Sequence, residues 1–353
     1  MRLVVDENLA YVEHFFAEHC LKKVAGRCLI AQDLVETDAL LVRSVTQVTA
    51  DLVKNTPIGF VGSATIGTDH LDLVGLAAQQ ITVANAAGCN AQAVAEYVVT
   101  AILTLRPEVL TAGQAFCLGV VGLGNVGTRL ARLAGRLGWR VLGYDPLQSH
   151  ADIEQVNLPE LLAQANAVSL HVPMTRTGDY PTYHLLAAAE LAQMSADCLL
   201  INTARGAVVA EADLLADIQQ TGRAVVLDVF EHEPRISAEL LTHLALVTPH
   251  VAGYSLEGKA RGTEMIYQAF CDWQNLPAPR QMAEVMPAAA CYFDQRPLVE
   301  QLLPLLPSLY DIRRDDAVLR ACVHEGWVDA ASFDQLRRDY PLRREWAAYG
   351  DQA

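Results

Sequence analysis

The chain has 353 residues, enough for two or three domains, and 52% of them are hydrophobic, so it can build substantial cores. A net charge of −15 disfavours nucleic acid and anionic membranes as partners, and no charge-free apolar run is long enough for a transmembrane helix. The eight cysteines lack CxxC spacing and the N-terminus does not resemble a signal peptide, which predicts reduced thiols in the cytoplasm.

The first 80 residues or so alternate short apolar runs with amphipathic stretches. We expect strands at 3–5, 39–44, 58–64 and 81–86. Such alternation of strands and helices predicts a parallel sheet. A helix is predicted over 90–105, because Asn90 is a suitable N-cap and a proline follows the apolar pattern.

A second alternating set follows and ends near residue 250. Its expected strands lie within 117–121, 139–146, 167–173, 198–204, 223–230 and 245–250. A helical pattern then leads into a proline-rich linker, and residues from about 288 onward are helical in pattern and rich in arginine and aspartate.

A glycine-rich turn joins the strand at 117–121 to the next helix. Gly122, Gly124 and Gly127 form GxGxxG in the strand–turn–helix context that dinucleotide binding needs. The first glycine permits the tight turn, the second lets the backbone approach a pyrophosphate, and the third allows close packing. We expect the amides of Asn125 and Val126 to hold the phosphates.

Asp145 ends the following strand, 18 residues after Gly127. A carboxylate there accepts hydrogen bonds from the ribose hydroxyls of NAD and repels the extra phosphate of NADP. An aspartate that only shapes the turn before Pro146 is the alternative. With the glycine turn, Asp145 predicts NAD as the cofactor.

Arg205 follows one further strand, Asp228 ends a second with Glu233 just beyond it, and His250 follows the last. The carboxyl ends of parallel strands meet at one edge of the sheet, so these side chains are expected together beside the nicotinamide. His250 suits a proton-transfer base, Arg205 a carboxylate fork, and Glu233 an acid that orients His250. Each could alone be a surface or structural residue, but together they predict hydride transfer from a hydroxy acid.

In this order, GLGNVG, INTARG, DVFEHEP and TPHVAG resemble the D-isomer-specific 2-hydroxyacid dehydrogenases over residues 1 to about 280. The resemblance implies that Arg205, Glu233 and His250 are catalytic. It implies NAD contacts from Asp145, Val172, Thr203, Ala204, Arg205, Asp228 and Gly253. Val172 departs from the threonine common in the family, so only a backbone contact is expected there.

The resemblance also implies the fold class, which is α/β with two Rossmann-like doubly wound parallel sheets. The NAD-binding domain, 91–255, is expected as an insertion in a substrate-binding domain made of 1–90 and 256–280. A small C-terminal α+β domain, 281–353, is expected to mediate homodimerisation.

A closer resemblance links six segments, among them LLVRSVT (40–46), GSATIGTDH (62–70), AGYSLEGKARGT (252–263) and LYDIRRDDAVLR (309–320), to a branch of the same family. That branch oxidises 4-phosphoerythronate to its 2-oxo acid in vitamin B6 synthesis. The resemblance implies substrate contacts from Ser44, Thr65 and Tyr254.

A doubly anionic substrate needs several cations, and Arg43, Lys259 and Arg261 are the candidates for binding its phosphate. We expect a small-molecule partner, with no metal, nucleic acid or membrane. Two alternatives remain at this point: the same chemistry on another acid, such as 3-phosphoglycerate, or a non-catalytic NAD-sensing protein.

Overall fold

The computed structural model describes residues 1–351 and divides into two compact units. One unit joins Met1–Asn90 to Ser255–Ala288, and the other joins Ala91–Tyr254 to the chain from Ala289 onward. Residues 91–254 are therefore an insertion within the first unit. The sequence-based boundaries at 255 and 280 lie one and eight residues from the observed ones at 254 and 288.

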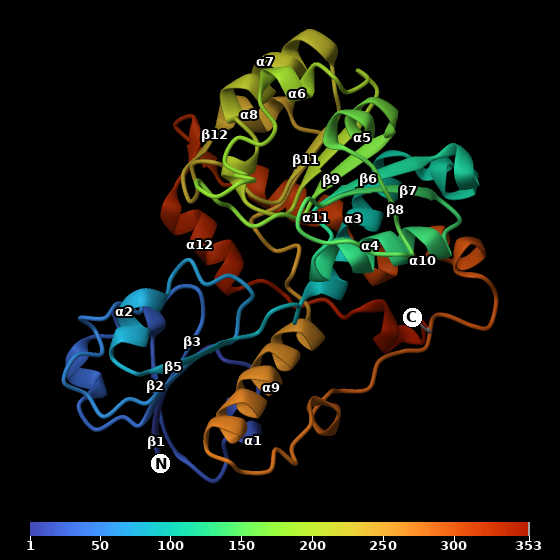
Figure 1. Ribbon diagram of the computed structural model, residues 1–353. Coiled ribbons are helices and arrows are strands. Elements are labelled where there is room, and N and C mark those ends of the chain that lie inside the picture. Colours follow the sequence, from blue (N-terminus) through green and yellow to red (C-terminus); the bar gives the residue numbers. More distant parts are fainter. Residues whose placement is uncertain (352–353) are drawn as a thin grey trace. The chain divides into compact units, whose positions relative to one another are not determined.

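A five-stranded parallel sheet forms the centre of the first unit (Figure 1). Its strands, in the order β2-β1-β3-β4-β5, are β1 (Arg2–Asp6), β2 (Cys20–Val24), β3 (Ala39–Val42), β4 (Phe60–Ser63) and β5 (Thr82–Asn85). Four of these strands were predicted. The fifth, β2, was not, because this edge strand is largely exposed and lacks an apolar pattern.

Helices cover both faces of this first sheet: α1 (Val12–Phe15) and α9 (Leu256–Trp273) on one, and α2 (Leu73–Ala78) on the other. Neighbouring residues of β1 explain how: Leu3 and Val5 pack with Phe270 of α9, whereas Val4 packs with Leu76 of α2. Because successive side chains of a strand point to opposite faces, an all-apolar strand needs cover on both.

A seven-stranded parallel sheet forms the second unit, in the order β13-β11-β10-β9-β6-β7-β8. Its strands are β6 (Cys117–Val121), β7 (Arg140–Tyr144), β8 (Glu154–Gln155), β9 (Ala167–Leu170), β10 (Leu199–Asn202), β11 (Val225–Leu227) and β13 (Leu246–Val247). The six predicted strands are all present, which confirms the predicted pair of parallel α/β sheets.

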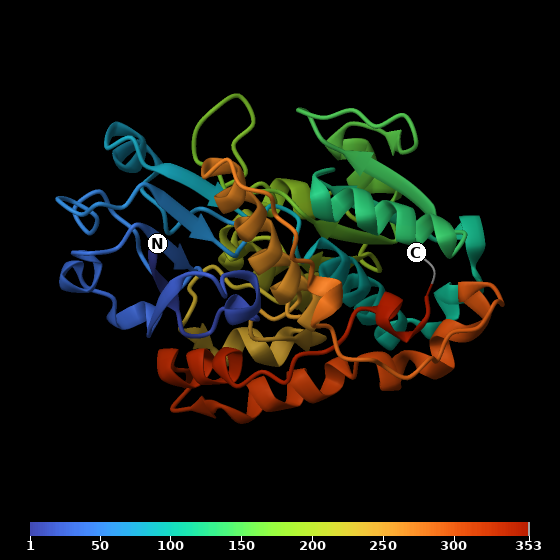
Figure 2. The same ribbon diagram turned by 90° about the horizontal axis from the view of Figure 1, so that it is seen from below.

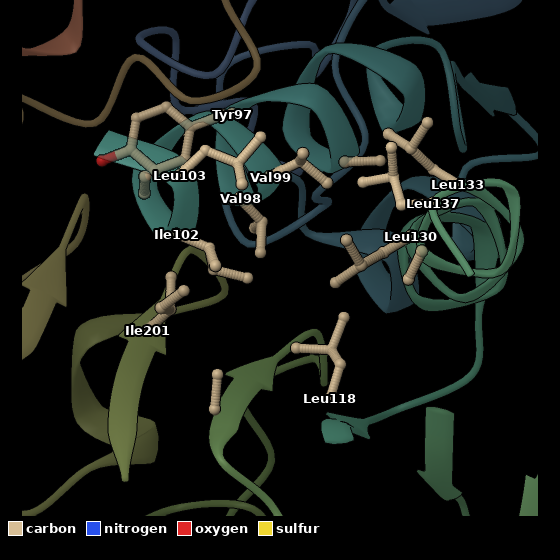
Figure 3. Packing of buried hydrophobic residues seen from close by; sticks show 14 of the residues in the cluster. Tyr97, Val98, Val99, Ile102, Leu103, Leu118, Leu130, Leu133, Leu137 and Ile201 are labelled. Carbon is tan, nitrogen blue, oxygen red and sulfur yellow. The ribbon is translucent and has the colours of Figure 1, made fainter. Parts of the chain in front are cut away.

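Two layers of helices enclose this sheet. On one face lie α3 (Ala91–Leu105) and α4 (Asn125–Arg136), and on the other α5 (Leu158–Gln164), α6 (Ala188–Leu191), α7 (Glu211–Thr221) and α8 (Ala238–His243). Figure 3 shows Ile102 of α3 and Leu130 of α4 near Leu118 and Ile201 of the sheet. This packing fixes the glycine turn against a rigid core.

The C-terminal region adds three helices to this unit: α10 (Leu298–Leu309), α11 (Ile312–Ala321) and α12 (Ala330–Arg338). In Figure 2 these orange-to-red helices follow one another in a row. Leu302 and Trp346 join the core of α3, and Phe333 joins the core on the opposite face. The region therefore shares the core of the inserted unit.

A small antiparallel sheet connects the same region to the inserted unit. It pairs β12 (Ile236–Ser237) with β15 (Trp327–Val328), and β15 with β14 (Val323–His324). Its presence agrees with the predicted α+β character of the C-terminal region. Across residues 1–351, no helix has the length and apolarity needed to cross a bilayer.

Candidate functional site

The carboxyl ends of six parallel strands of the inserted unit supply the predicted site residues. Gly122 follows β6, Asp145 β7, Val172 β9, Arg205 β10, Asp228 β11, and His250 β13. The strands point the same way, so these positions lie along one edge of the sheet, as the sequence predicted.

The glycine turn has a different physical requirement at each of its three glycines. Gly122 has φ 91°, in the left-handed region. A Cβ on Gly127 would lie 1.9 Å from the Gly122 carbonyl oxygen, so this position has no room for a side chain. A Cβ on Gly124 would meet nothing within 4 Å. Gly124 thus borders open space, as expected where the backbone approaches a pyrophosphate.

Gly124 is also the N-cap of α4 and has no side chain to cap the helix. The first amides of the helix, at Asn125 and Val126, are therefore available to a phosphate. The turn thus fits a dinucleotide: a bare helix N-terminus faces the space beside Gly124.

Asp145 shapes the loop next to this turn. One carboxylate oxygen accepts from the amide of Leu123 at 2.8 Å, and the other accepts from the amides of Leu147 and Gln148 at 2.9 and 3.1 Å. Asp145 thus performs the turn role considered from sequence. Each carboxylate oxygen has two lone pairs, so acceptor capacity remains for the predicted ribose contact.

Val172 and His171 follow β9 and contact the glycine turn. A Cβ on Gly122 would lie 2.9 Å from Val172 Cγ1 and 2.8 Å from the His171 carbonyl oxygen. The imidazole of His171 lies 2.9 Å from Ser169 Oγ and 3.5 Å from Thr203 Oγ1. Burial lowers the pKa of His171 to about 3, so the imidazole is neutral at physiological pH. His171 was not predicted as a site residue.

The loop that carries Arg205 is held by the buried side chain of Asn202. Its amide nitrogen donates to the Arg205 carbonyl at 2.9 Å, and its oxygen accepts from the Ala204 amide at 3.0 Å. Gly206 packs against the next loop, because a Cβ there would lie 1.9 Å from the carbonyl carbon of Phe230. The Arg205 loop and the loop that contains Glu233 are therefore in direct contact.

Asp228, at the end of β11, is buried and fixes the loop around His250. Its carboxylate accepts from Thr248 Oγ1 at 2.6 Å and from the amides of Val251 and Ala252 at 2.7 and 3.0 Å. Burial raises the pKa of Asp228, whereas the charge of His250 and these hydrogen bonds lower it. The effect of burial is the larger, so the net pKa is raised. The NAD contact expected at Asp228 stays a prediction.

His250 and Glu233 form an ion-pair geometry. His250 Nδ1 lies 2.9 Å from Glu233 Oε2, and Glu233 Oε1 accepts from the Phe230 amide at 2.8 Å. Burial raises the pKa of Glu233, but the charge of His250 and the two hydrogen bonds outweigh it, so the net pKa is lowered. An ionised Glu233 therefore fixes the orientation of the imidazole.

The backbone of His250 has φ 58°, a left-handed conformation that is uncommon for a residue with a side chain. The surrounding contacts, chiefly those of Asp228, hold it there. The His250 side chain is 33% exposed, so its ring can reach a ligand while Nδ1 is bound to Glu233.

Tyr254 and Gly253 lie in the turn after His250, where the Tyr254 amide donates to the Val251 carbonyl at 2.8 Å. Arg343, from the C-terminal region, donates to the carbonyls of Val251 and Tyr254 at 3.0 and 3.4 Å, and also to that of Ala252. The C-terminal region thus supports the loop of the predicted base, which the sequence did not reveal.

In the first unit, Ser44 and Thr65 follow the adjacent parallel strands β3 and β4, so both lie at the carboxyl edge of that sheet. Ser44 is exposed. Thr65 Oγ1 lies 2.9 Å from Ser63 Oγ, which lies 2.9 Å from the buried His70 Nε2. Both positions suit the substrate contact predicted for them, which stays a prediction.

The predicted phosphate-binding cations also belong to the first unit. Arg43, Lys259 and Arg261 are all half-buried, and Arg261 donates to the Cys89 carbonyl. Among residues 1–351, no group of three or more histidine, cysteine or acidic side chains could hold a metal ion.

Comparison with known proteins assigns these features to a family. Residues 109–252 match the D-isomer specific 2-hydroxyacid dehydrogenase NAD binding domain, and residues 285–350 match a domain of unknown function, DUF3410. The chain is 55% identical over 351 residues to an erythronate-4-phosphate dehydrogenase of Acinetobacter baumannii, with 99% of each chain covered. It is 46% identical to one of Psychrobacter cryohalolentis, with 99% and 97% covered.

Solved structures show the same fold at lower identity. D-Lactate dehydrogenase of Aquifex aeolicus, complexed with NAD and lactic acid, superposes with a TM-score of 0.63 at 22% identity, covering 78% of this chain and 96% of that one. With its near full-length relatives and its matching NAD-binding domain, this chain belongs to the erythronate-4-phosphate dehydrogenases within the D-isomer specific 2-hydroxyacid dehydrogenase family.

Proposed function

We propose that this protein oxidises 4-phospho-D-erythronate at C2 to 3-hydroxy-2-oxo-4-phosphooxybutanoate, using NAD, on the route to pyridoxal phosphate. The observation that carries the chemistry is the 2.9 Å contact between His250 and Glu233 at the same sheet edge as the glycine turn. The choice of substrate rests on the 55% identity to relatives of that name.

In this proposal His250 is the acid–base residue. Its ring accepts the C2 hydroxyl proton as the alcohol is oxidised, and the ionised Glu233 stabilises the imidazolium that forms. Bound NAD⁺ supplies the hydride acceptor. His171 stays neutral nearby, so it adds no positive charge beside the nicotinamide pocket.

Arg205 binds the substrate carboxylate in this proposal, because a guanidinium fork matches the two oxygens of a carboxylate. Asn202 and Gly206 fix its loop. The NAD contacts comprise the glycine turn, Asp145, Val172, Thr203, Ala204, Arg205, Asp228 and Gly253. Ser44, Thr65 and Tyr254 bind the rest of the substrate.

The decisive assay is NADH formation at equal concentrations of 4-phosphoerythronate, erythronate and 3-phosphoglycerate. A parallel run includes a 2-oxo acid, in case NADH stays bound. We expect 4-phosphoerythronate to have by far the highest kcat/KM and erythronate to be oxidised only slowly. Turnover of 3-phosphoglycerate instead would keep the chemistry and reject the substrate. His250→Ala should lower kcat about 10²- to 10⁴-fold and leave NAD binding intact.

We also propose that the protein is a homodimer through its C-terminal region. That region has four exposed hydrophobic residues that a partner subunit would remove from water: Leu303, Val318, Val323 and Trp327. Light scattering should give a dimer, and Val318→Asp should shift it toward monomer. A monomeric wild-type protein would reject this proposal.

A cytoplasmic location is part of the same proposal. No disulfide joins the eight cysteines, all of which lie within residues 1–351, and this supports a reducing compartment. Thiol trapping of the protein in intact cells should find them reduced.

A further inference from the structure

The last turn of α12 brings an arginine to the turn that follows His250. Arg337 Nη2 lies 3.3 Å from the hydroxyl of Tyr254, and its guanidinium lies 6.0 Å from the centre of the Tyr254 ring. Arg337 is half-buried and belongs to the same compact unit as His250. The C-terminal region therefore places a cation beside a residue that we propose binds substrate.

This guanidinium is not fully satisfied by the protein. Within residues 1–351, Arg337 Nε is buried and has no hydrogen-bond partner. A buried donor on a charged group is costly when it is left unpaired. An anionic ligand with several acceptor oxygens would remove that cost.

Two other arginines of this unit, the buried Arg223 and the half-buried Arg343, donate to several acceptors of the protein. Arg223 donates to both carboxylate oxygens of Asp217 and to three carbonyls. Arg343 donates to carbonyls around Val251. Arg337 differs from Arg223, whose Nε donates to Asp217, because the buried Nε of Arg337 has no partner.

The charges around Arg337 keep it cationic. Burial lowers its pKa, but Tyr254, Glu233 and Asp334 outweigh burial and the net pKa is raised. Glu233 already accepts from His250 and from the Phe230 amide, so it does not need Arg337 as its partner. A positive group is thus retained near the catalytic pair in a chain of net charge −15.

We propose that Arg337, together with the Tyr254 hydroxyl, binds the phosphate group of the substrate and selects phosphorylated over unphosphorylated hydroxy acids. This assignment rests on the proposed function. A guanidinium and a phenol both donate to phosphate oxygens, and the guanidinium can do so through two parallel hydrogen bonds. The C-terminal region is then part of the substrate site as well as the proposed dimer interface.

The test compares Arg337→Met, Arg337→Lys and the matched control Arg338→Met, an exposed arginine next to it on the same helix. Each full-length variant is assayed with NAD and either 4-phosphoerythronate or erythronate. For Arg337→Met we expect kcat/KM to fall about a hundredfold with the phosphorylated acid and less than about threefold with erythronate. With 4-phosphoerythronate, the kcat/KM of Arg337→Lys should lie between those of wild type and Arg337→Met. The kcat/KM of Arg338→Met should equal that of wild type.

Inorganic phosphate provides a second readout that does not need turnover. Phosphate should raise the melting temperature of the wild-type protein and of Arg338→Met. Arg337→Lys should bind phosphate with an apparent Kd that is about tenfold weaker or more. This measurement stands even if Arg337→Met does not fold.

Three outcomes would overturn the assignment. Equal losses with both acids, together with a moved acid limb of the pH profile, would show that Arg337 acts on Glu233 and His250. Arg337→Met indistinguishable from Arg338→Met would also reject it, as would unchanged phosphate binding in Arg337→Lys. If wild type shows no preference for the phosphorylated acid, the proposed function fails separately, and phosphate binding alone decides the role of Arg337.

Discussion

The buried carboxylate of Asp228 accepts a hydrogen bond from the amide of Val251 at 2.7 Å, directly after the left-handed residue His250. The residue that follows β11 thereby fixes the backbone of the predicted base. The same carboxylate accepts from Thr248, which lies 2.7 Å from the hydroxyl of Tyr97 in α3. The base is thus connected to the core through hydrogen bonds.

Asp228→Asn should test this connection. In this variant a side-chain NH₂ group replaces one carboxylate oxygen, so two donors face each other. One buried donor that now binds Asp228 would lose its acceptor. We expect the free energy of unfolding to fall by about 1–3 kcal/mol and kcat to fall at least tenfold. Urea titration and NADH assays measure the two effects. Wild-type kcat in this variant would mean that Arg343 suffices to hold the loop.

Glu233→Gln should lower activity. Loss of the negative charge removes stabilisation of the imidazolium that forms when His250 takes the hydroxyl proton, so kcat should fall about tenfold or more in NADH assays. Glu231→Gln is the matched control, because Glu231 pairs with His184 and not with His250. An equal loss in both variants would reject the specific role of Glu233.

The lowered pKa of Glu233 also predicts how stability varies with pH. The folded-state pKa of Glu233 lies below the unfolded value of about 4.3, so the ionised carboxylate stabilises the folded protein above pH 4.3. This stabilisation is lost as the pH falls through the folded-state pKa. The difference in unfolding free energy between wild type and Glu233→Gln should therefore be larger at pH 7 than at pH 4. Urea unfolding at both pH values measures it.

Two glycine substitutions should separate binding from folding. Gly127→Ala would place a Cβ 1.9 Å from the Gly122 carbonyl oxygen, so we expect a loss of stability or of soluble protein. Gly124→Ala has open space around its Cβ, so the protein should fold normally and bind NAD about tenfold or more weakly. Thermal melts with and without NAD compare the two. Unchanged NAD affinity in Gly124→Ala would contradict the placement of the pyrophosphate.

Glu96 of α3 predicts the opposite pH trend. Burial, followed by the charge of Glu345, raises its pKa well above the usual value. A protein that contains such an acid becomes less stable as the pH rises from the unfolded-state pKa of the acid toward its folded-state pKa. The free energy of unfolding falls by about 1.4 kcal/mol for each pH unit in that range. Glu96→Gln can still accept from the Trp346 amide, so it should gain stability relative to wild type at pH 8 and not at pH 5. Urea unfolding at the two pH values measures the gain, and equal effects at both would contradict this.

The sequence by itself determined the local features of this protein. Apolar runs bounded by turns predicted most strands of both sheets, since a strand buried on both faces needs continuous hydrophobic residues. The glycine turn was predictable because its backbone conformation and close approach exclude side chains. The contact between His250 and Glu233 followed from the rule that parallel strands end at one edge.

Only the tertiary structure decided the contacts between distant segments. The edge strand β2 lacks an apolar pattern. Its position beside β1, and not its composition, makes it a strand. Asp228 proved to hold a loop through its buried oxygens, which depends on the position of Val251. Arg337 reaches Tyr254 across 83 residues of chain, and nothing local distinguishes it from Arg338. Packing of α12 on the inserted unit decides which of these two arginines contacts Tyr254.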